Sequence, residues 1–120
     1  LNDERFDVNH RNISMCDFTV LHYTCQKGYI ECVRYILAMG RDVNLNIKDG
    51  RGMTPIDYAK EEKEKEQRSK ERKSNYTDII ELLESFERNP NETRIKLRIQ
   101  LGFSGKIFFI FLLFNSLFYF

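Results

Sequence analysis

The sequence predicts an all-α fold built from stacked helix–turn–helix units, with a charged helical segment inserted in one of them. The first observation is a repeat, because the chain reads TVLHYTCQKG from Thr19 and TPIDYAKEEK from Thr54. The second is that apolar residues recur at helical spacing after each copy, in GYIECVRYILAMG and NYTDIIELLESF. The third is that acids stand four positions before bases in the block 60–74, an arrangement that stabilises helices.

Each copy of the repeat begins with a residue that suits the start of a helix. Thr19 and Thr54 are expected to be N-caps, because a threonine hydroxyl can accept a hydrogen bond from a free amide of the first turn. Pro55 follows at the first helical position, where its missing N–H costs nothing. We therefore expect the first helix of each unit to begin directly after its threonine.

The turn between the two helices of a unit is marked by Gly28 in the first copy. Helices often end in a left-handed backbone conformation that glycine adopts readily. In the second copy Asn75 occupies this place, and asparagine is the best substitute for glycine there. The second helix of the first unit is then expected to bury Ile30, Val33, Ile36 and Leu37, to expose Glu31, Arg34 and Tyr35, and to end at Gly40.

The block 60–74 separates the first helix of the second unit from Asn75. We expect this helix to continue through the block as a solvated rod before the chain returns at Asn75. Three pairs with the acid four residues before its base support the helix: Glu61 with Lys65, Glu64 with Arg68, and Glu66 with Lys70. The alternative is a docking element for an acidic partner or for phosphates, although the interspersed glutamates and the absence of aromatic residues make nucleic acid an unsuitable ligand.

The segment 89–102 is expected to form a C-terminal helix. Asn89 suits the N-cap, Pro90 the first helical position and Glu92 the third, while Gly102 suits the end. Apolar residues alternate with polar ones from residue 95 to residue 101, which is the period of a strand. The helix is preferred because both ends of the segment carry helix signals.

The tail 103–120 is rich in Phe, Leu and Ile, and its stretch 107–120 is shorter than a spanning helix requires. Three interpretations stay open: a hydrophobic helix that packs on the last repeat, a C-terminal membrane anchor, or non-native sequence from a mis-predicted gene end. Membrane contact is expected only through residues 107–120.

Taken together, TVLHYTCQKGYIECVRYILAMGRDVN resembles one ankyrin repeat, with Val20 in place of the usual Pro. DVNHRN at Asp7 resembles the end of a preceding repeat, and GRGMTPIDYA resembles the start of a following one, with Asp57 in place of the usual His. The resemblance implies an ankyrin-repeat solenoid over residues 1–88. It would comprise the end of one repeat, a complete repeat 19–53, and a repeat 54–86 interrupted by the insert 60–74.

This resemblance implies a module that binds another protein, as a scaffold or adaptor without catalysis and without a cofactor. It places the contact surface on the hairpin finger and the inner helices, at Tyr23, Gln26, Lys48, Arg51, Met53 and Tyr58. Rigid aromatic, Met and Arg side chains are typical of interface hot spots. His22 and Cys25 could be a metal or nucleophile pair, but we expect His22 in the hydrogen-bond network at the helix start and Cys25 in the core.

Composition limits the remaining possibilities. The 120 residues suffice for one modest core, and the net charge of +1 gives no general reason to expect nucleic acid. Cys16, Cys25 and Cys32 form no CxxC pair and are expected to be buried thiols of a reducing compartment, so we expect a cytoplasmic or nuclear monomer. Leu1 in place of Met suggests a fragment edge. Two alternatives therefore stay open: a targeting appendage of a larger enzyme or regulator, and a membrane-tethered adaptor.

Overall fold

The computed structural model describes residues 7–102, which form five α-helices, one short 3-10 helix and no strand. The all-α prediction is confirmed for this part of the chain. The elements are η1 (Ile13–Met15), α1 (Val20–Lys27), α2 (Ile30–Met39), α3 (Pro55–Lys65), α4 (Lys70–Arg88) and α5 (Pro90–Gln100).

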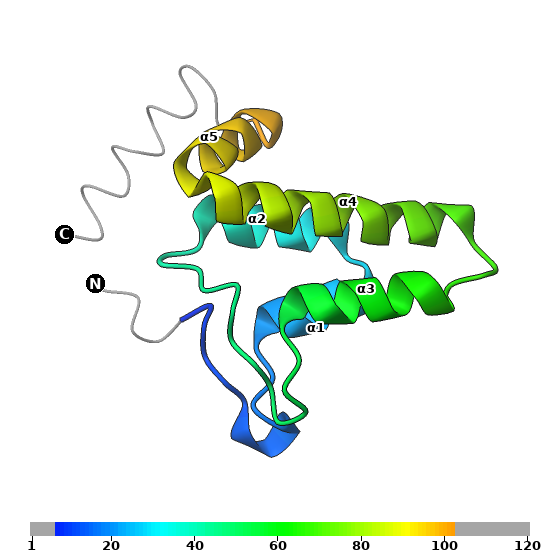
Figure 1. Cartoon of the computed structure of the whole chain (residues 1–120). Coiled ribbons are helices and arrows are strands. Elements are labelled where there is room, and N and C mark those ends of the chain that lie inside the picture. Colours follow the sequence, from blue (N-terminus) through cyan, green and yellow to red (C-terminus); the bar gives the residue numbers. More distant parts are fainter. Residues whose placement is uncertain (1–6, 103–120) are drawn as a thin grey trace.

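The helices form two layers (Figure 1). Helices α1 and α3 lie side by side in one layer, and α2 and α4 lie side by side in the other. Helix α5 contacts both α2 and α4. The loop 41–54, which we call the finger, leaves the two layers on the side of α1 and α3 and reaches the level of η1 (Figure 1).

Both predicted N-caps are confirmed. The Thr19 hydroxyl accepts a hydrogen bond from the His22 amide at 3.2 Å, and the Thr54 hydroxyl accepts one from the Asp57 amide at 3.4 Å. The Asp57 carboxylate accepts from the Thr54 amide in return, at 3.0 Å. These reciprocal bonds satisfy amides that a helix start leaves free, so each first helix begins where its threonine predicts.

The turn at Gly28 has the predicted left-handed backbone, and Tyr76 of α4 packs against it. Gly28 has a φ of 75°, in the left-handed region. A Cβ atom at this position would lie 3.1 Å from Cζ of Tyr76, a fully buried residue of α4. The Tyr76 hydroxyl donates to the carbonyl oxygen of Gln26 at 2.8 Å, near the end of α1. The turn therefore requires glycine for its backbone and for the close approach of this ring.

The core lies between the two layers and under α5. Val33 and Leu37 of α2 are buried as predicted, whereas Ile30 and Ile36 are only partly buried. The buried apolar side chains come from all five α-helices: Leu21, Cys25, Val33, Leu37, Ala38, Ala59, Tyr76, Ile79, Leu83, Phe86 and Leu97. Burial of this continuous cluster is the main force that holds the helices together.

The prediction for the charged block 60–74 was wrong about the position of the turn. Helix α3 ends at Lys65, α4 begins at Lys70, and Asn75 lies inside α4. The Ser69 hydroxyl caps α4 by accepting from the Arg72 amide at 3.1 Å. Because the turn lies in the middle of the block, α3 and α4 pack against each other. A single long helix through the block would have no neighbouring helix to pack against.

The ion pairs of this block also differ in part from those predicted. Lys65 pairs with Glu61 at 3.1 Å, as predicted, and lies 3.7 Å from Glu62. Glu66 pairs with Arg72 at 3.4 Å rather than with Lys70. The turn at residues 66–69 redirects the chain, so Glu66 and Lys70 do not share one helix face.

The prediction of three buried cysteines was wrong for two of them. Cys25 is buried, but Cys16 and Cys32 are exposed, and all three are free thiols. Burial raises the pKa of the Cys25 thiol. Cys32 is exposed because the described part of the chain places no helix on this side of α2. Its counterpart in the second unit, Ile79, is buried because α4 contacts α2.

Helix α5 forms as predicted, with Asn89 accepting from the Glu92 amide at 3.3 Å and Pro90 at its start. Two arginines connect it to the end of α2: Arg94 donates to the carbonyl oxygen of Leu37 at 3.3 Å, and Arg98 donates to that of Ala38 at 2.8 Å. Within residues 7–102, no helix has the length and apolar character needed to cross a bilayer. The tail 107–120 lies outside the described residues.

Candidate protein-binding surface

The finger is held in shape by one carboxylate. Asp49 is buried, and its Oδ1 accepts hydrogen bonds from the amides of Arg51 and Met53, both at 2.9 Å. Its other oxygen accepts a hydrogen bond from the hydroxyl of Tyr58 in α3. The carboxylate thus closes the tip of the finger and attaches it to the helix that follows.

These contacts shift the pKa values of both side chains. Burial alone would raise the pKa of Asp49, but the hydrogen bonds from Tyr58, Met53 and Arg51 outweigh burial and lower it below its usual value. Burial and the hydrogen bond to Asp49 raise the pKa of Tyr58 to about 12. At neutral pH the pair is therefore an ionised carboxylate and a neutral phenol that donates to it.

His22 connects the finger to α1. Its Nδ1 accepts from the Thr19 amide at 3.1 Å, so the proton lies on Nε2, which donates to the carbonyl oxygen of Met53 at 2.9 Å. The Phe18 ring stacks on the His22 ring with centroids 5.1 Å apart and meets the Tyr58 ring edge-on at 5.2 Å. The expected role of His22 in the helix-start network is confirmed, and the network extends into the finger.

Three of the six residues predicted to contact a partner lie in the finger. Lys48 and Arg51 are exposed, and Met53 is partly buried. The carbonyl oxygen of Lys48 accepts from the Arg11 guanidinium at 3.2 Å, and the Arg51 guanidinium lies 5.8 Å from the centre of the Tyr58 ring. The finger therefore presents two cations on a backbone whose conformation Asp49 holds.

Tyr58 was also predicted to lie on this surface, and the structure corrects that expectation. Its side chain is only 2% exposed. The ring is enclosed by Phe18 and His22, and its hydroxyl is bonded to Asp49. These contacts come from segments far apart in the sequence, so the helical spacing of Tyr58 alone could not reveal its burial.

The other two predicted residues lie on α1. Tyr23 is 41% exposed, and its ring lies 6.2 Å from the ring of Tyr29 and 5.8 Å from the ammonium of Lys27. Gln26 is partly buried, and its carbonyl oxygen accepts from Tyr76. Among the described residues no ring contact or ion pair joins the Tyr23 side chain to the finger.

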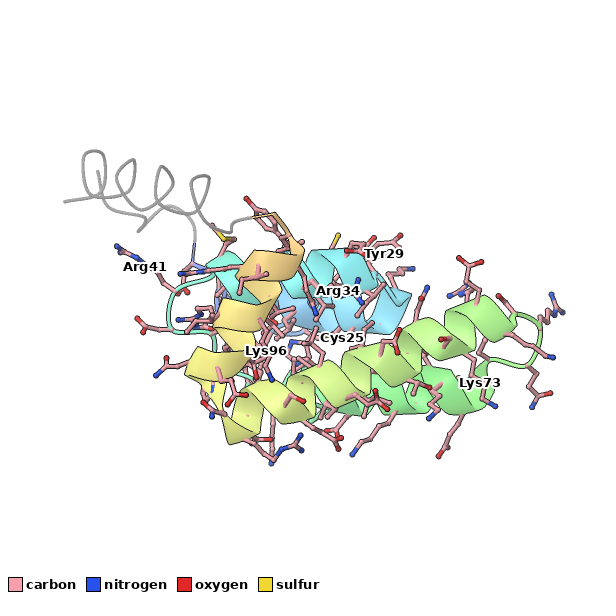
Figure 2. All side chains as sticks on the ribbon, turned by 90° about the horizontal axis from the view of Figure 1, so that it is seen from above. Cys25, Tyr29, Arg34, Arg41, Lys73 and Lys96 are labelled. Atoms are coloured by element: carbon pink, nitrogen blue, oxygen red, sulfur yellow. The ribbon has the colours of Figure 1, made fainter. Side chains whose placement is uncertain are left out.

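Tyr29 extends this surface, and the sequence analysis did not select it. It is 47% exposed and lies at the turn between α1 and α2 (Figure 2). Val20, at a spacing of three residues before Tyr23, is exposed on the same helix face. We call Val20, Tyr23, Lys27 and Tyr29 the tyrosine patch. The available signal for Tyr29 was its place next to the turn glycine, where a large aromatic residue has little room to be buried.

His22 and Cys25 were considered as a metal or nucleophile pair in the sequence analysis. No group of three or more His, Cys, Asp or Glu side chains between residues 7 and 102 could hold a metal ion. His22 and Cys25 are both fully buried, and both ring nitrogens of His22 take part in the helix-start and finger bonds.

Comparison with known proteins relates part of the chain to a known family. Residues 1–59 match the family model described as ankyrin repeats (many copies). No curated protein and no solved structure matches the chain significantly. Ankyrin repeats are non-catalytic modules that mediate protein–protein interaction. The family match, the capped helix pair α1–α2 and the finger that follows it together identify residues 1–59 as ankyrin repeats.

Proposed function

We propose that this chain is a scaffold or adaptor module that binds a partner protein through the finger and the tyrosine patch. The observation that carries the proposal is the pair of exposed rings at Tyr23 and Tyr29, which contact each other on the surface of the packed helices. Tyrosine supplies a large contact area with little loss of side-chain freedom, and exposed rings of this kind dominate the energetics of many interfaces.

The finger contributes charge to the same proposal. Lys48 and Arg51 are exposed on a loop that Asp49 holds in one conformation. Cations on a preformed surface accelerate and orient the approach of a partner with complementary charge, and little conformational entropy is lost on binding. Gln26 and Met53 are partly exposed and would add polar and apolar contact area beside them.

The proposal also covers how the helix pairs are organised. We treat the pairs α1–α2 and α3–α4 as consecutive units of an ankyrin solenoid, and the charged ends of α3 and α4 as an extension of the second unit. We expect a monomer in the cytoplasm or nucleus, a location that the free thiols of Cys16, Cys25 and Cys32 support.

The test compares partner capture by the full chain and by surface variants in cells, with quantitative proximity labelling as the readout. The patch variant carries Tyr23→Ser and Tyr29→Ser, and the finger variant carries Lys48→Ser and Arg51→Ser. The matched control is Tyr35→Ser, because Tyr35 is an exposed tyrosine of α2 outside both groups. Circular dichroism of each purified variant verifies that the helices are intact.

Proteins that are labelled by the wild type and by the control, but not by the patch or finger variants, would support the proposal once a purified candidate binds directly. Equal labelling by all four proteins would contradict it, because the proposed surface would then make no difference to the partners found.

A further inference from the structure

The charged residues of the α3–α4 hairpin differ in whether they form ion pairs. Glu61 and Glu62 lie next to Lys65, and Glu66 pairs with Arg72, so three of the acids neutralise one lysine and one arginine. This leaves Lys60, Lys63 and Lys73 without an ion-pair partner among residues 7–102. The block 60–74 contains seven Lys and Arg residues against five Glu residues, so positive charge is in excess around the turn of the hairpin.

These three lysines line one open groove, together with Glu64 and Ile80. The groove has a volume of about 370 Å³. Lys60, Lys63 and Glu64 lie on α3, whereas Lys73 and Ile80 lie on α4, so the groove lies between two contacting helices. Lys73 belongs to the part of α4 that extends beyond α1 and α2 (Figures 1 and 2), where neither of those helices covers it. We call these five residues the lysine groove.

The lysine groove carries an excess of positive charge that no ion pair among residues 7–102 neutralises. Three cations and one acid leave it with an excess of positive charge, and like charges along one groove repel each other in the folded chain. The partly buried side chain of Ile80 adds an apolar surface between them. A groove with cations at its edges and an apolar residue inside is complementary to a segment that carries carboxylates on both sides of one apolar side chain.

We propose that the lysine groove binds an acidic segment of a partner protein, whose apolar side chain contacts Ile80 while its Asp and Glu residues meet Lys60, Lys63 and Lys73. This inference rests on the proposed protein-binding function and adds a second contact site with a stated charge. It favours protein over nucleic acid, because no aromatic side chain of the described residues lines the groove to stack on a base and Glu64 would repel phosphates.

The test measures binding of a fluorescently labelled synthetic peptide to the full chain by fluorescence anisotropy. The peptide is short and rich in Asp and Glu, with a single Leu at its centre. A second peptide has Ser in place of Leu, a third has Lys in place of the acids, and a single-stranded oligouridine is the nucleic-acid probe. Each titration is made at low salt and at several-fold higher salt, which shortens the range of surface electrostatics.

The groove variant carries Lys60→Gln and Lys73→Gln. Its matched control carries Arg88→Gln and Lys96→Gln, which remove the same charge from exposed positions outside the groove. Among residues 7–102, Arg88 bonds the Ser85 hydroxyl and Lys96 pairs with Glu92, and both side chains are exposed, so neither change removes a core contact of the described fold. We expect the groove variant to bind the acidic peptide about fivefold more weakly and the control to bind it within about twofold of the wild type.

We also expect the Ser peptide to bind about tenfold more weakly than the Leu peptide, and added salt to weaken both. Equal loss in the groove variant and its control would overturn the proposal, because binding would then depend on net charge alone. Equal binding of the Leu and Ser peptides would remove the role of Ile80, and groove-dependent binding of oligouridine without peptide binding would overturn the protein assignment.

Failure of this inference is distinguishable from failure of the proposed function. If the groove variant keeps every partner in proximity labelling while the patch and finger variants lose them, only the lysine groove is refuted. If none of these variants changes the partners but the acidic peptide still binds in a groove-dependent way, the groove stands and the finger and patch assignment fails.

Discussion

The side chain of Asn9 holds the backbone of Asn44. Its Oδ1 accepts from the Asn44 amide at 2.9 Å, and its Nδ2 donates to the carbonyl oxygen of Asp42 at 2.8 Å. Each of these asparagines ends a DVN sequence, so the same motif occurs twice and the first copy is bonded to the second. The two copies thus lie side by side, and the segment before α1 supports the start of the finger.

Asn9→Ala should therefore destabilise the fold. It removes two hydrogen bonds to backbone groups, and we expect a loss of about 1–2 kcal/mol in the free energy of unfolding. Urea unfolding followed by circular dichroism measures this loss. Asn91→Ala, at an exposed position of α5, is the control and should change stability by less than about 0.5 kcal/mol. An equal effect of the two substitutions would show that the DVN contact contributes nothing.

Gly28 and Gly52 form a matched pair for a second prediction. Both have a positive φ, 75° and 78°, but a Cβ at Gly28 would meet the Tyr76 ring while one at Gly52 would meet no atom within 4 Å. Gly52→Ala should cost about 1 kcal/mol from backbone strain alone. Gly28→Ala should cost at least about 1 kcal/mol more, because the Tyr76 ring must also move. Equal unfolding midpoints in urea would contradict a role for the ring contact.

The Asp49 carboxylate should make stability depend on acid pH. Its pKa is lowered in the folded protein, so the stability that it contributes is fully present above its unfolded pKa of about 4 and is lost as pH falls through the folded value. In Asp49→Asn, the free energy of unfolding should be lower at neutral pH and should fall less on acidification. Asp78→Asn, at an exposed position of α4, is the control. The prediction fails if Asp49→Asn and the wild type lose stability in parallel between about pH 6 and about pH 3.

Arg98 should stabilise the end of α2. Its guanidinium donates to the carbonyl oxygen of Ala38, one of the groups that a helix end leaves without a partner, and its charge opposes the negative end of the helix dipole. Arg98→Ala should lower the free energy of unfolding by about 1–2 kcal/mol. Lys96→Ala, which breaks an exposed pair with Glu92 on the same helix, should cost less than about 0.5 kcal/mol. Thermal unfolding of both variants tests the difference, and equal losses would assign the effect to surface charge.

Much of the fold could be predicted from the sequence because its signals are local. A threonine cap bonds an amide three residues away, and Gly28 adopts its left-handed backbone within a single turn, so neither feature depends on distant segments. The helix at Pro90–Gln100 follows in the same way from Asn89, Pro90 and Glu92. These signals outweighed the strand-like alternation of its apolar residues.

Other features depended on contacts between distant segments. Tyr58 is buried because Phe18, His22 and Asp49 enclose it, and Cys32 is exposed while its counterpart Ile79 is covered. Position in a repeat did not distinguish these cases, because equivalent residues of two units have different neighbours.

The sequence by itself therefore determined the helical class and the starts of α1, α3 and α5, since each of these starts depends on bonds within a few residues. The tertiary structure decided where the α3–α4 hairpin turns, because the block 60–74 favours helix throughout and contains neither Gly nor Pro. It also decided which side chains are free for a partner, since exposure depends on the elements that lie beside each helix.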